Sequence, residues 1–151
     1  MSLITKSANK VLLGIGSYAS LNWKFLEKDV RYFADFIGDK NLVHFDQESL
    51  QKLGFEKPFV YGMMPTSLLS KLYLSTFISP IYLSQSVNFM APIYVDEEIE
   101  LKIVVSSLEE TKKKQVKCTL NSTVTKIEKN AVAVTGTGLL LLDPESVEII
   151  K

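Results

Sequence analysis

The chain has very little of the residue types that build disulfides and metal centres. Its 151 residues contain a single cysteine, Cys118, and a single histidine, His44. One cysteine excludes a disulfide within the chain, and one His with one Cys leaves no ligand cluster of the zinc type. We therefore expect no metal, and a protein of a reducing, cytoplasmic compartment.

An excess of either charge is also lacking, as are long apolar runs. Lys plus Arg number 17 and Asp plus Glu number 17, so the net charge is zero and nothing favours nucleic acid or an acidic membrane as partner. The apolar patch at 11–15 is too short for a signal peptide or a membrane span, which needs roughly 20 residues. No linker or repeat divides the sequence, and we expect residues 1–151 to form one domain.

The first half of the chain predicts helices. Apolar residues between 25 and 38 recur at helical spacing, and Gly38 is a plausible stop. Asp46 is typical of an N-cap and predicts a short helix through about Leu53. The segment 61–79 carries only one charge, Lys71, which indicates a buried helix. Pro65 fits only in its first turn, so this helix should begin near Gly62 or Met63.

The second half of the chain changes to a period of two. Alternating apolar residues predict strands at 81–89, 99–106, 116–124 and 131–142, with an earlier strand near 18–25. Helices followed by short-linked strands favour an α+β fold with an antiparallel sheet. The economical solution is the hotdog arrangement, in which the sheet curls around the buried helix and covers most of it. Open sheet edges favour a homodimer.

The segment GDKNLVHFD, residues 38–46, carries the groups most suited to proton transfer. Asp39 and His44 lie in a loop, where a carboxylate and an imidazole can share one water for general acid–base chemistry. Gly62 at the start of the buried helix would present unpaired N–H groups to an oxyanion. From spacing alone, a helix-joining loop with a satisfied histidine is the more frequent alternative, and Gly62 fits a plain helix start equally well.

Several neighbouring residues have plainer interpretations. Asp46 is better explained as an N-cap, and Asn41 first as a turn former. The pair at 63–64 is more often core packing than a substrate contact. Cys118, in phase with apolar neighbours, indicates a buried structural residue and not a nucleophile.

Resemblance to a known family gives more information about these residues than their spacing does. FADFIGDKNLVHFD and KPFVYGMM resemble the MaoC-like hydratases, the (R)-specific enoyl-CoA hydratase branch of the hotdog superfamily, with a pattern close to A-x-x-[ST]-G-D-x-N-P-x-H-x-D and then P-x-x-H-G-M. The matching residues are Ala34, Gly38, Asp39, Asn41, His44, Asp46, Pro58, Gly62 and Met63. The strand and turn YLSQSVNFMAPIYVDEEIEL is also similar, with Gln85, Phe89, Pro92 and Asp96 in place. The similarity spans about 16–142.

The resemblance implies a hydro-lyase that acts on acyl thioesters. Asp39 and His44 would activate the water that adds to a trans-2-enoyl thioester, giving the (R)-3-hydroxyacyl product. The N–H of Gly62 would bind the thioester oxygen, and Asn41 and Ser70 would support the site. The substrate would be a CoA or acyl-carrier-protein thioester, with no further cofactor. Gln85 would make a structural hydrogen bond or contact the active loop.

The sequence departs from the family pattern at several positions. Leu42 replaces a proline, which leaves the loop less rigid. Ile37 and Leu26 each replace a Ser or Thr, and Tyr61 replaces the histidine before Gly-Met. None removes a proposed catalytic atom, but Tyr61 changes the shape of the pocket. A hotdog thioesterase and a non-catalytic acyl-thioester-binding or dimerisation module therefore stay open as alternatives.

Overall fold

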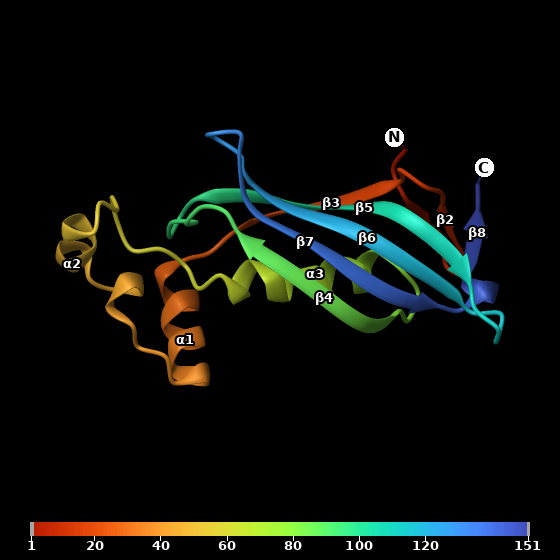
Figure 1. The fold of residues 1–151 in the computed structure, drawn as a ribbon, viewed down its shortest axis with the longest axis horizontal. Helices are drawn as coiled ribbons and strands as arrows, with labels where there is room; N and C mark the ends of the chain where they lie inside the picture. The colour runs from red at the N-terminus through yellow and green to blue at the C-terminus, as the bar shows by residue number, and fades with distance from the viewer. Residues whose placement is uncertain (1, 151) are drawn as a thin grey trace.

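The computed structural model describes residues 2–150. Its main feature is a five-stranded antiparallel sheet in the order β3–β5–β6–β7–β4 (Figure 1). The strands are β3 (Tyr18–Lys24), β4 (Ile81–Phe89), β5 (Glu98–Glu110), β6 (Val116–Lys126) and β7 (Ala131–Leu142). Period-two alternation turns Leu101, Ile103 and Leu120 into the core, fully buried. All five predicted strands are present.

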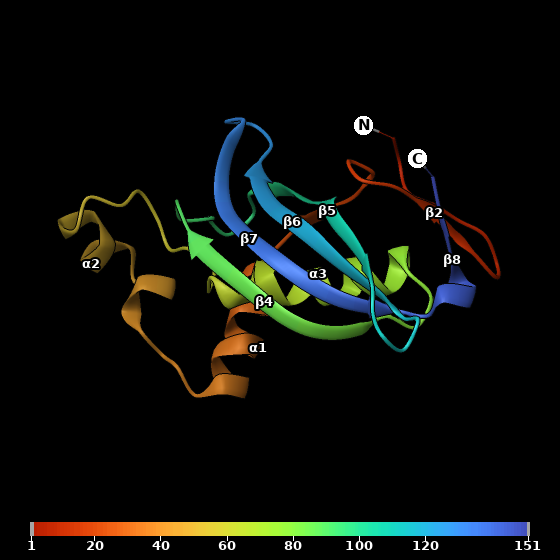
Figure 2. The same ribbon diagram turned by 45° about the vertical axis from the view of Figure 1, so that its right-hand side comes forward.

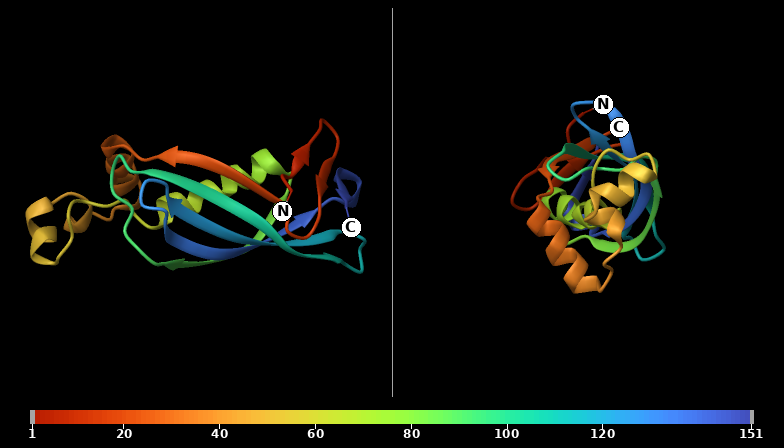
Figure 3. Two further views of the ribbon diagram at one scale, coloured as in Figure 1. Left: turned by 90° about the horizontal axis from the view of Figure 1, so that it is seen from above. Right: turned by 90° about the vertical axis from the view of Figure 1, so that its left-hand side faces the viewer.

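Helix α3 (Met63–Thr76) lies along the inner face of this sheet. The end-on view of Figure 3 shows the strands curving around it, and Figure 2 shows β4 and β7 crossing over it. Gly62 is its N-cap, and Pro65 falls in the first turn, where its missing N–H costs no hydrogen bond. Leu69, Leu72 and Tyr73 are buried against the sheet. The predicted α+β hotdog fold, with a sheet wrapped around a central helix, is confirmed.

The sheet covers most of the central helix, as predicted, and leaves one side of it exposed in a single chain. Ser70 and Lys71 are exposed, and Leu74 is 64% exposed. Edge strand β4 also leaves Ile81 and Phe89 more than half exposed. The physical reason is that the five strands curve around the helix without closing, so one side of it and the β4 edge have no covering layer among residues 2–150.

A separate group of helices projects from one end of the molecule, opposite the two termini (Figure 1). It consists of α1 (Glu27–Ile37), a short 3-10 turn (Leu42–His44) and α2 (Gln47–Lys52). Gly38 ends α1 with a left-handed φ of 74°, which only glycine adopts readily. The Asp46 carboxylate accepts a hydrogen bond from the amide of Glu48, 3.2 Å away, so its predicted role as an N-cap is confirmed.

The second sheet was not predicted from the sequence. It joins β1 (Thr5–Lys6), β2 (Val11–Leu13) and β8 (Val147–Ile149) at the end far from α1. The apolar patch at 11–15 thus supplies a strand of the core. Within residues 2–150, no helix is long and apolar enough to cross a bilayer.

Candidate active site

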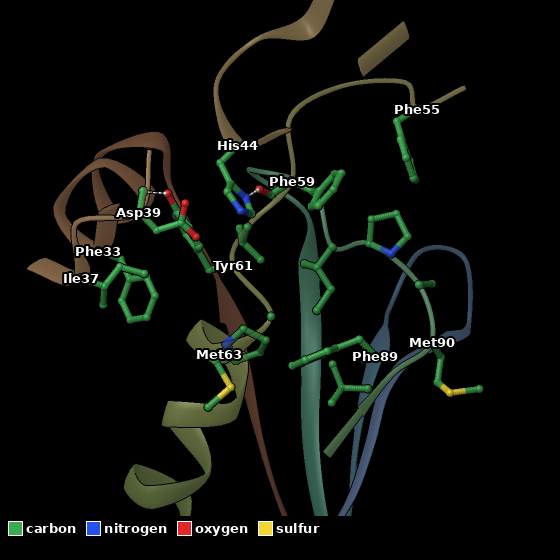
Figure 4. A pocket seen from close by; sticks show the side chains of 17 residues that line it. Phe33, Ile37, Asp39, His44, Phe55, Phe59, Tyr61, Met63, Phe89 and Met90 are labelled. Carbon is green, nitrogen blue, oxygen red and sulfur yellow. Dashed lines mark hydrogen bonds between the residues drawn. The ribbon is translucent and has the colours of Figure 1, made fainter. Parts of the chain in front are cut away.

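A cavity of about 770 Å³ lies where the projecting helices meet the N-terminus of α3 and the end of the sheet (Figure 4). It is lined by Phe33, Ile37, Asp39, His44, Phe55, Phe59, Val60, Tyr61, Gly62, Met63, Pro65, Phe89, Met90, Ala91, Pro92, Ile93 and Val134. Most of these side chains are apolar. Asp39 and His44 come from the loop after α1, and Gly62 comes from the start of α3. The fold therefore brings the three residues predicted for chemistry to one cavity.

The His44 imidazole is held in a defined tautomer. Its side chain is buried, and its Nδ1 lies 2.6 Å from the carbonyl oxygen of Phe59. A carbonyl oxygen can only accept, so Nδ1 carries the proton of the neutral ring and Nε2 has the free lone pair. The 3-10 turn that presents the ring is capped by Asn41, whose side-chain oxygen accepts from the amide of Val43 at 3.3 Å. The histidine is thus prepared to accept a proton at Nε2.

Asp39 follows directly after the left-handed Gly38 and is exposed at the cavity rim. Its Oδ1 accepts a hydrogen bond of 3.0 Å from the backbone amide of Asn41, which is an Asx turn. Within residues 2–150 its Oδ2 has no hydrogen-bond partner and is available to a ligand in the cavity. Asn41 therefore acts as the turn former that the sequence predicted, and it does not line the cavity.

Tyr61 connects these two groups. Its ring is stacked on the His44 imidazole, with centroids 3.6 Å apart and planes 27° from parallel. Its hydroxyl donates a hydrogen bond to the backbone carbonyl of Asp39. Burial and the nearby negative charges of Asp39 and Asp35 raise the pKa of the Tyr61 phenol above its usual value. Sequence reasoning treated this residue only as a change of pocket shape, although its position directly before Gly62 was a usable signal.

Gly62 places the first turn of α3 at the cavity wall. Within the described part of the chain its amide hydrogen makes no hydrogen bond, as expected at a helix N-terminus. A Cβ on this residue would lie 2.5 Å from Cε1 of Phe89, so the ring packs directly on the glycine. The Phe89 ring fills the space of a side chain, and Gly62 itself lines the cavity.

The structure does not bring every predicted supporting residue to the site. Ser70 is exposed on α3 and does not line the cavity, so within one chain it does not hold Asp39 or His44. Gln85 makes a structural network instead: its Oε1 accepts from the hydroxyls of Tyr73 at 3.1 Å and Tyr82 at 2.5 Å. The physical reason is direction, because Ser70 lies on the exposed side of α3 and Gln85 turns toward Tyr73 and Tyr82 instead of the cavity.

The structure also tests the predictions for the methionine pair at 63–64 and for Cys118. Met64 is buried in the core, as predicted for the pair, whereas Met63 is 53% exposed and lines the cavity. Cys118 is fully buried, and burial raises its pKa to about 12. Its predicted structural role is confirmed. Within residues 2–150, no group of three His, Cys, Asp or Glu side chains could hold a metal ion.

Comparison with known proteins finds a matching family model and a similar curated protein. The family model described as a MaoC like domain matches residues 11–129. A mitochondrial 3-hydroxyacyl-[acyl-carrier-protein] dehydratase of Arabidopsis thaliana is 35% identical over 82 residues, which are 54% of this chain and 49% of that protein. The chain thus spans about half the length of this curated relative.

Solved structures match over most of the chain. The (R)-hydratase from A. caviae involved in PHA biosynthesis has a TM-score of 0.77 and 33% identity, covering 87% of this chain and 98% of that one. R-Hydratase PhaJ1 from Pseudomonas aeruginosa has a TM-score of 0.75 at 22% identity, covering 90% and 84%, and shows the shared fold. With its family-model match, its antiparallel sheet and its enclosed helix, the chain belongs to the MaoC-like family of the hotdog superfamily.

Proposed function

We propose that the chain is a hydro-lyase that adds water reversibly across the 2,3 double bond of a trans-2-enoyl thioester, giving an (R)-3-hydroxyacyl thioester. The observation that carries the proposal is that Asp39, His44 and Gly62 line one cavity with mostly apolar walls. The A. caviae neighbour is named an (R)-hydratase and the Arabidopsis relative a dehydratase. Hydration and dehydration are two directions of one reaction, so both names support this chemistry.

In the proposed mechanism, a water molecule binds between Nε2 of His44 and the free carboxylate oxygen of Asp39. Nε2 accepts a proton from the water as its oxygen bonds to C3 of the substrate. Negative charge then moves to the thioester oxygen, which accepts a hydrogen bond from the amide of Gly62 at the positive end of α3. A proton passes from the Asp39–His44 pair to C2. The whole water molecule ends in the product, and both side chains return to their starting forms.

The proposal also covers the carrier of the acyl group, the number of domains, the oligomeric state and the need for a cofactor. The substrate is a CoA or acyl-carrier-protein thioester, residues 1–151 act as one domain, and the chain works as a homodimer. No cofactor is required, because side chains and one backbone amide supply the proton acceptor, the proton donor and the oxyanion donor.

The test is hydration of crotonyl-CoA by the purified protein, followed by the loss of the absorbance of the conjugated enoyl thioester. Asp39→Asn and His44→Ala should each reduce the rate at least about a hundredfold, which is the usual contribution of general acid–base catalysis. Asp35→Asn, on the neighbouring turn of α1, is the matched control and should keep full activity. Release of free thiol without loss of the double bond would instead indicate a thioesterase. Binding without turnover would indicate a non-catalytic module.

A further inference from the structure

We propose that Tyr61 is a positioning residue that fixes Asp39 and His44 relative to each other. Its hydroxyl binds the backbone carbonyl of Asp39, and its ring stacks on the imidazole of His44. The inference rests on the proposed function for its catalytic readout. The family pattern has a histidine at this position, so the role comes from the contacts of this chain and not from that pattern.

The loop that carries Asp39 has few other ties to the body of the protein. Within residues 2–150, the hydrogen bonds of residues 38–42 stay among residues 34–46, with one exception. That exception is the bond from the Tyr61 hydroxyl to the carbonyl of Asp39. Leu42 also leaves this loop without the fixed φ of a proline. The tyrosine hydroxyl is therefore the link between the carboxylate-bearing loop and the first turn of α3.

The imidazole of His44 is held by two groups that meet it from different directions. The Phe59 carbonyl holds the Nδ1 edge of the ring at 2.6 Å. The Tyr61 ring covers one face of the imidazole, with centroids 3.6 Å apart, and blocks its movement toward that side. Together these two contacts fix the direction in which Nε2 points. Because the same tyrosine also holds Asp39, it sets the separation of the two groups that must share one water.

Tyr61 is itself well anchored. It is 5% exposed, and its ring packs on Phe33 with centroids 5.2 Å apart. It directly precedes α3, and its carbonyl accepts the amide of Met64 at 2.9 Å. A residue fixed to a rigid element can hold a looser loop, whereas a residue on the loop could not. A phenol is protonated at neutral pH, and the raised pKa of Tyr61 extends the range in which its hydroxyl is a donor to higher pH.

Two substitutions of Tyr61 test the hydroxyl contact and the ring contact separately. Tyr61→Phe removes the hydroxyl and keeps the stacked ring, so kcat for crotonyl-CoA should fall about tenfold while KM changes less than about twofold. Tyr61→Leu removes both contacts, and kcat should fall about a hundredfold. Tyr32→Phe is the matched control, because Tyr32 is 76% exposed on α1 and does not line the cavity. It should keep the wild-type kcat and KM.

The single histidine of the chain provides a readout that does not depend on activity. The imidazole C–H signals in the NMR spectrum belong to His44 alone, and a stacked tyrosine displaces them by its ring current. The displacement should persist in Tyr61→Phe and be reduced in Tyr61→Leu, where the more distant rings of Phe45 and Phe59 remain. Circular dichroism and the unfolding temperature of each variant establish that it is folded before its kinetics are compared.

The outcomes distinguish this inference from the proposed function. A wild-type protein without hydratase activity would overturn the proposed function, and the NMR comparison would still decide the stacking. An active wild type with an equally active Tyr61→Phe would overturn the role of the hydroxyl alone. Unmoved His44 signals in a folded Tyr61→Leu would overturn the role of the ring.

Discussion

Gly62 affects both the packing at the cavity wall and the hydrogen bonding of the backbone there. Its φ of −58° is available to any L-residue, so backbone strain is not the reason for a glycine here. The reason is the Phe89 ring, which lies where a Cβ would point. The absent side chain leaves room for that ring. Within residues 2–150 the Gly62 amide has no hydrogen-bond partner, so it is available to a ligand oxygen in the cavity. One residue therefore serves packing and, in the proposed reaction, charge stabilisation.

These two roles of Gly62 can be measured separately. Gly62→Ala should push the Phe89 ring aside and lower the free energy of unfolding by about 1 kcal/mol, since that ring is half exposed and can yield. It should also lower kcat/KM about tenfold by keeping the thioester oxygen away from the amide. Urea unfolding and crotonyl-CoA kinetics are the measurements.

The double variant Gly62→Ala/Phe89→Ala is the companion experiment. It removes the contact between the new methyl group and the ring, so the Gly62→Ala change should cost less stability when made in a Phe89→Ala background. The activity should stay low, because the methyl group remains beside the amide. Full activity in the double variant would show that close approach to the backbone at this position is not needed.

The end of the β6–β7 hairpin supports the cavity wall from outside. Lys126 and Glu97 form an ion pair of 3.1 Å with side chains only 5% and 9% exposed. The same ammonium donates to the carbonyl of Pro92 at 2.8 Å and lies 4.6 Å from the centroid of the Tyr94 ring. Glu97 accepts the amide of Tyr94 at 2.9 Å. Pro92 lines the cavity, so a charged pair buried behind the wall holds it in place.

Breaking this buried pair should be costly. Lys126→Met leaves the Glu97 carboxylate buried without its partner, and we expect the free energy of unfolding to fall by about 3 kcal/mol in urea titrations. Lys24→Met is the matched control, because the Lys24–Glu98 pair is 3.6 Å long with side chains 43% and 65% exposed. Its loss should cost less than about 1 kcal/mol.

Removing both charges of the Lys126–Glu97 pair tests whether the unpaired buried carboxylate causes the loss of stability. Lys126→Met/Glu97→Gln should be more stable than Lys126→Met alone, because no unpaired charge is then buried. A double variant no more stable than the single one would assign the loss to packing around Tyr94 instead. The KM for the enoyl thioester should rise in Lys126→Met, since the Pro92 carbonyl loses its donor.

At the scale of the whole molecule, strand β4 and the neighbouring part of α3 leave apolar side chains exposed at the edge of the sheet. Among the described residues 2–150, strand β4 pairs with β7 alone, so its other edge has unpaired backbone groups. Ile81 is 54% exposed, Leu83 47% and Leu74 64%. An open edge strand with exposed apolar side chains is a surface that a second copy of the chain can cover, which supports the proposed homodimer.

The dimer prediction is tested by light scattering after size-exclusion chromatography. The wild type should give twice the 17.0 kDa mass of one chain. Leu83→Lys places a charge on the open edge and should shift the mass toward a monomer. Leu53→Lys makes the same change on a residue 65% exposed beside α2, at the end of the molecule that carries the projecting helices, and should leave the dimer intact. A wild-type monomer at micromolar concentration would contradict the prediction.

The amino-acid sequence by itself determined the local features of this protein. Strand periods, the start of α3 beside Pro65, the stop at Gly38 and the cap at Asp46 each depend on residues a few positions apart. The same holds for the turn that joins Asp39 to Asn41, whose bond is closed within the segment. Local geometry of this kind follows from φ preferences and from side-chain hydrogen bonds to neighbouring amides.

Only the tertiary structure decided which distant segments meet. The stacking of Tyr61 on His44, the Phe89 ring on Gly62 and the parallel pairing of β2 with β8 join parts of the chain that no periodicity relates. The outward direction of Ser70 belongs to the same group. These contacts depend on the curvature of the sheet around α3 and on where each strand stops. Both are set by the packing of the whole core, so a pattern read along one segment does not contain them.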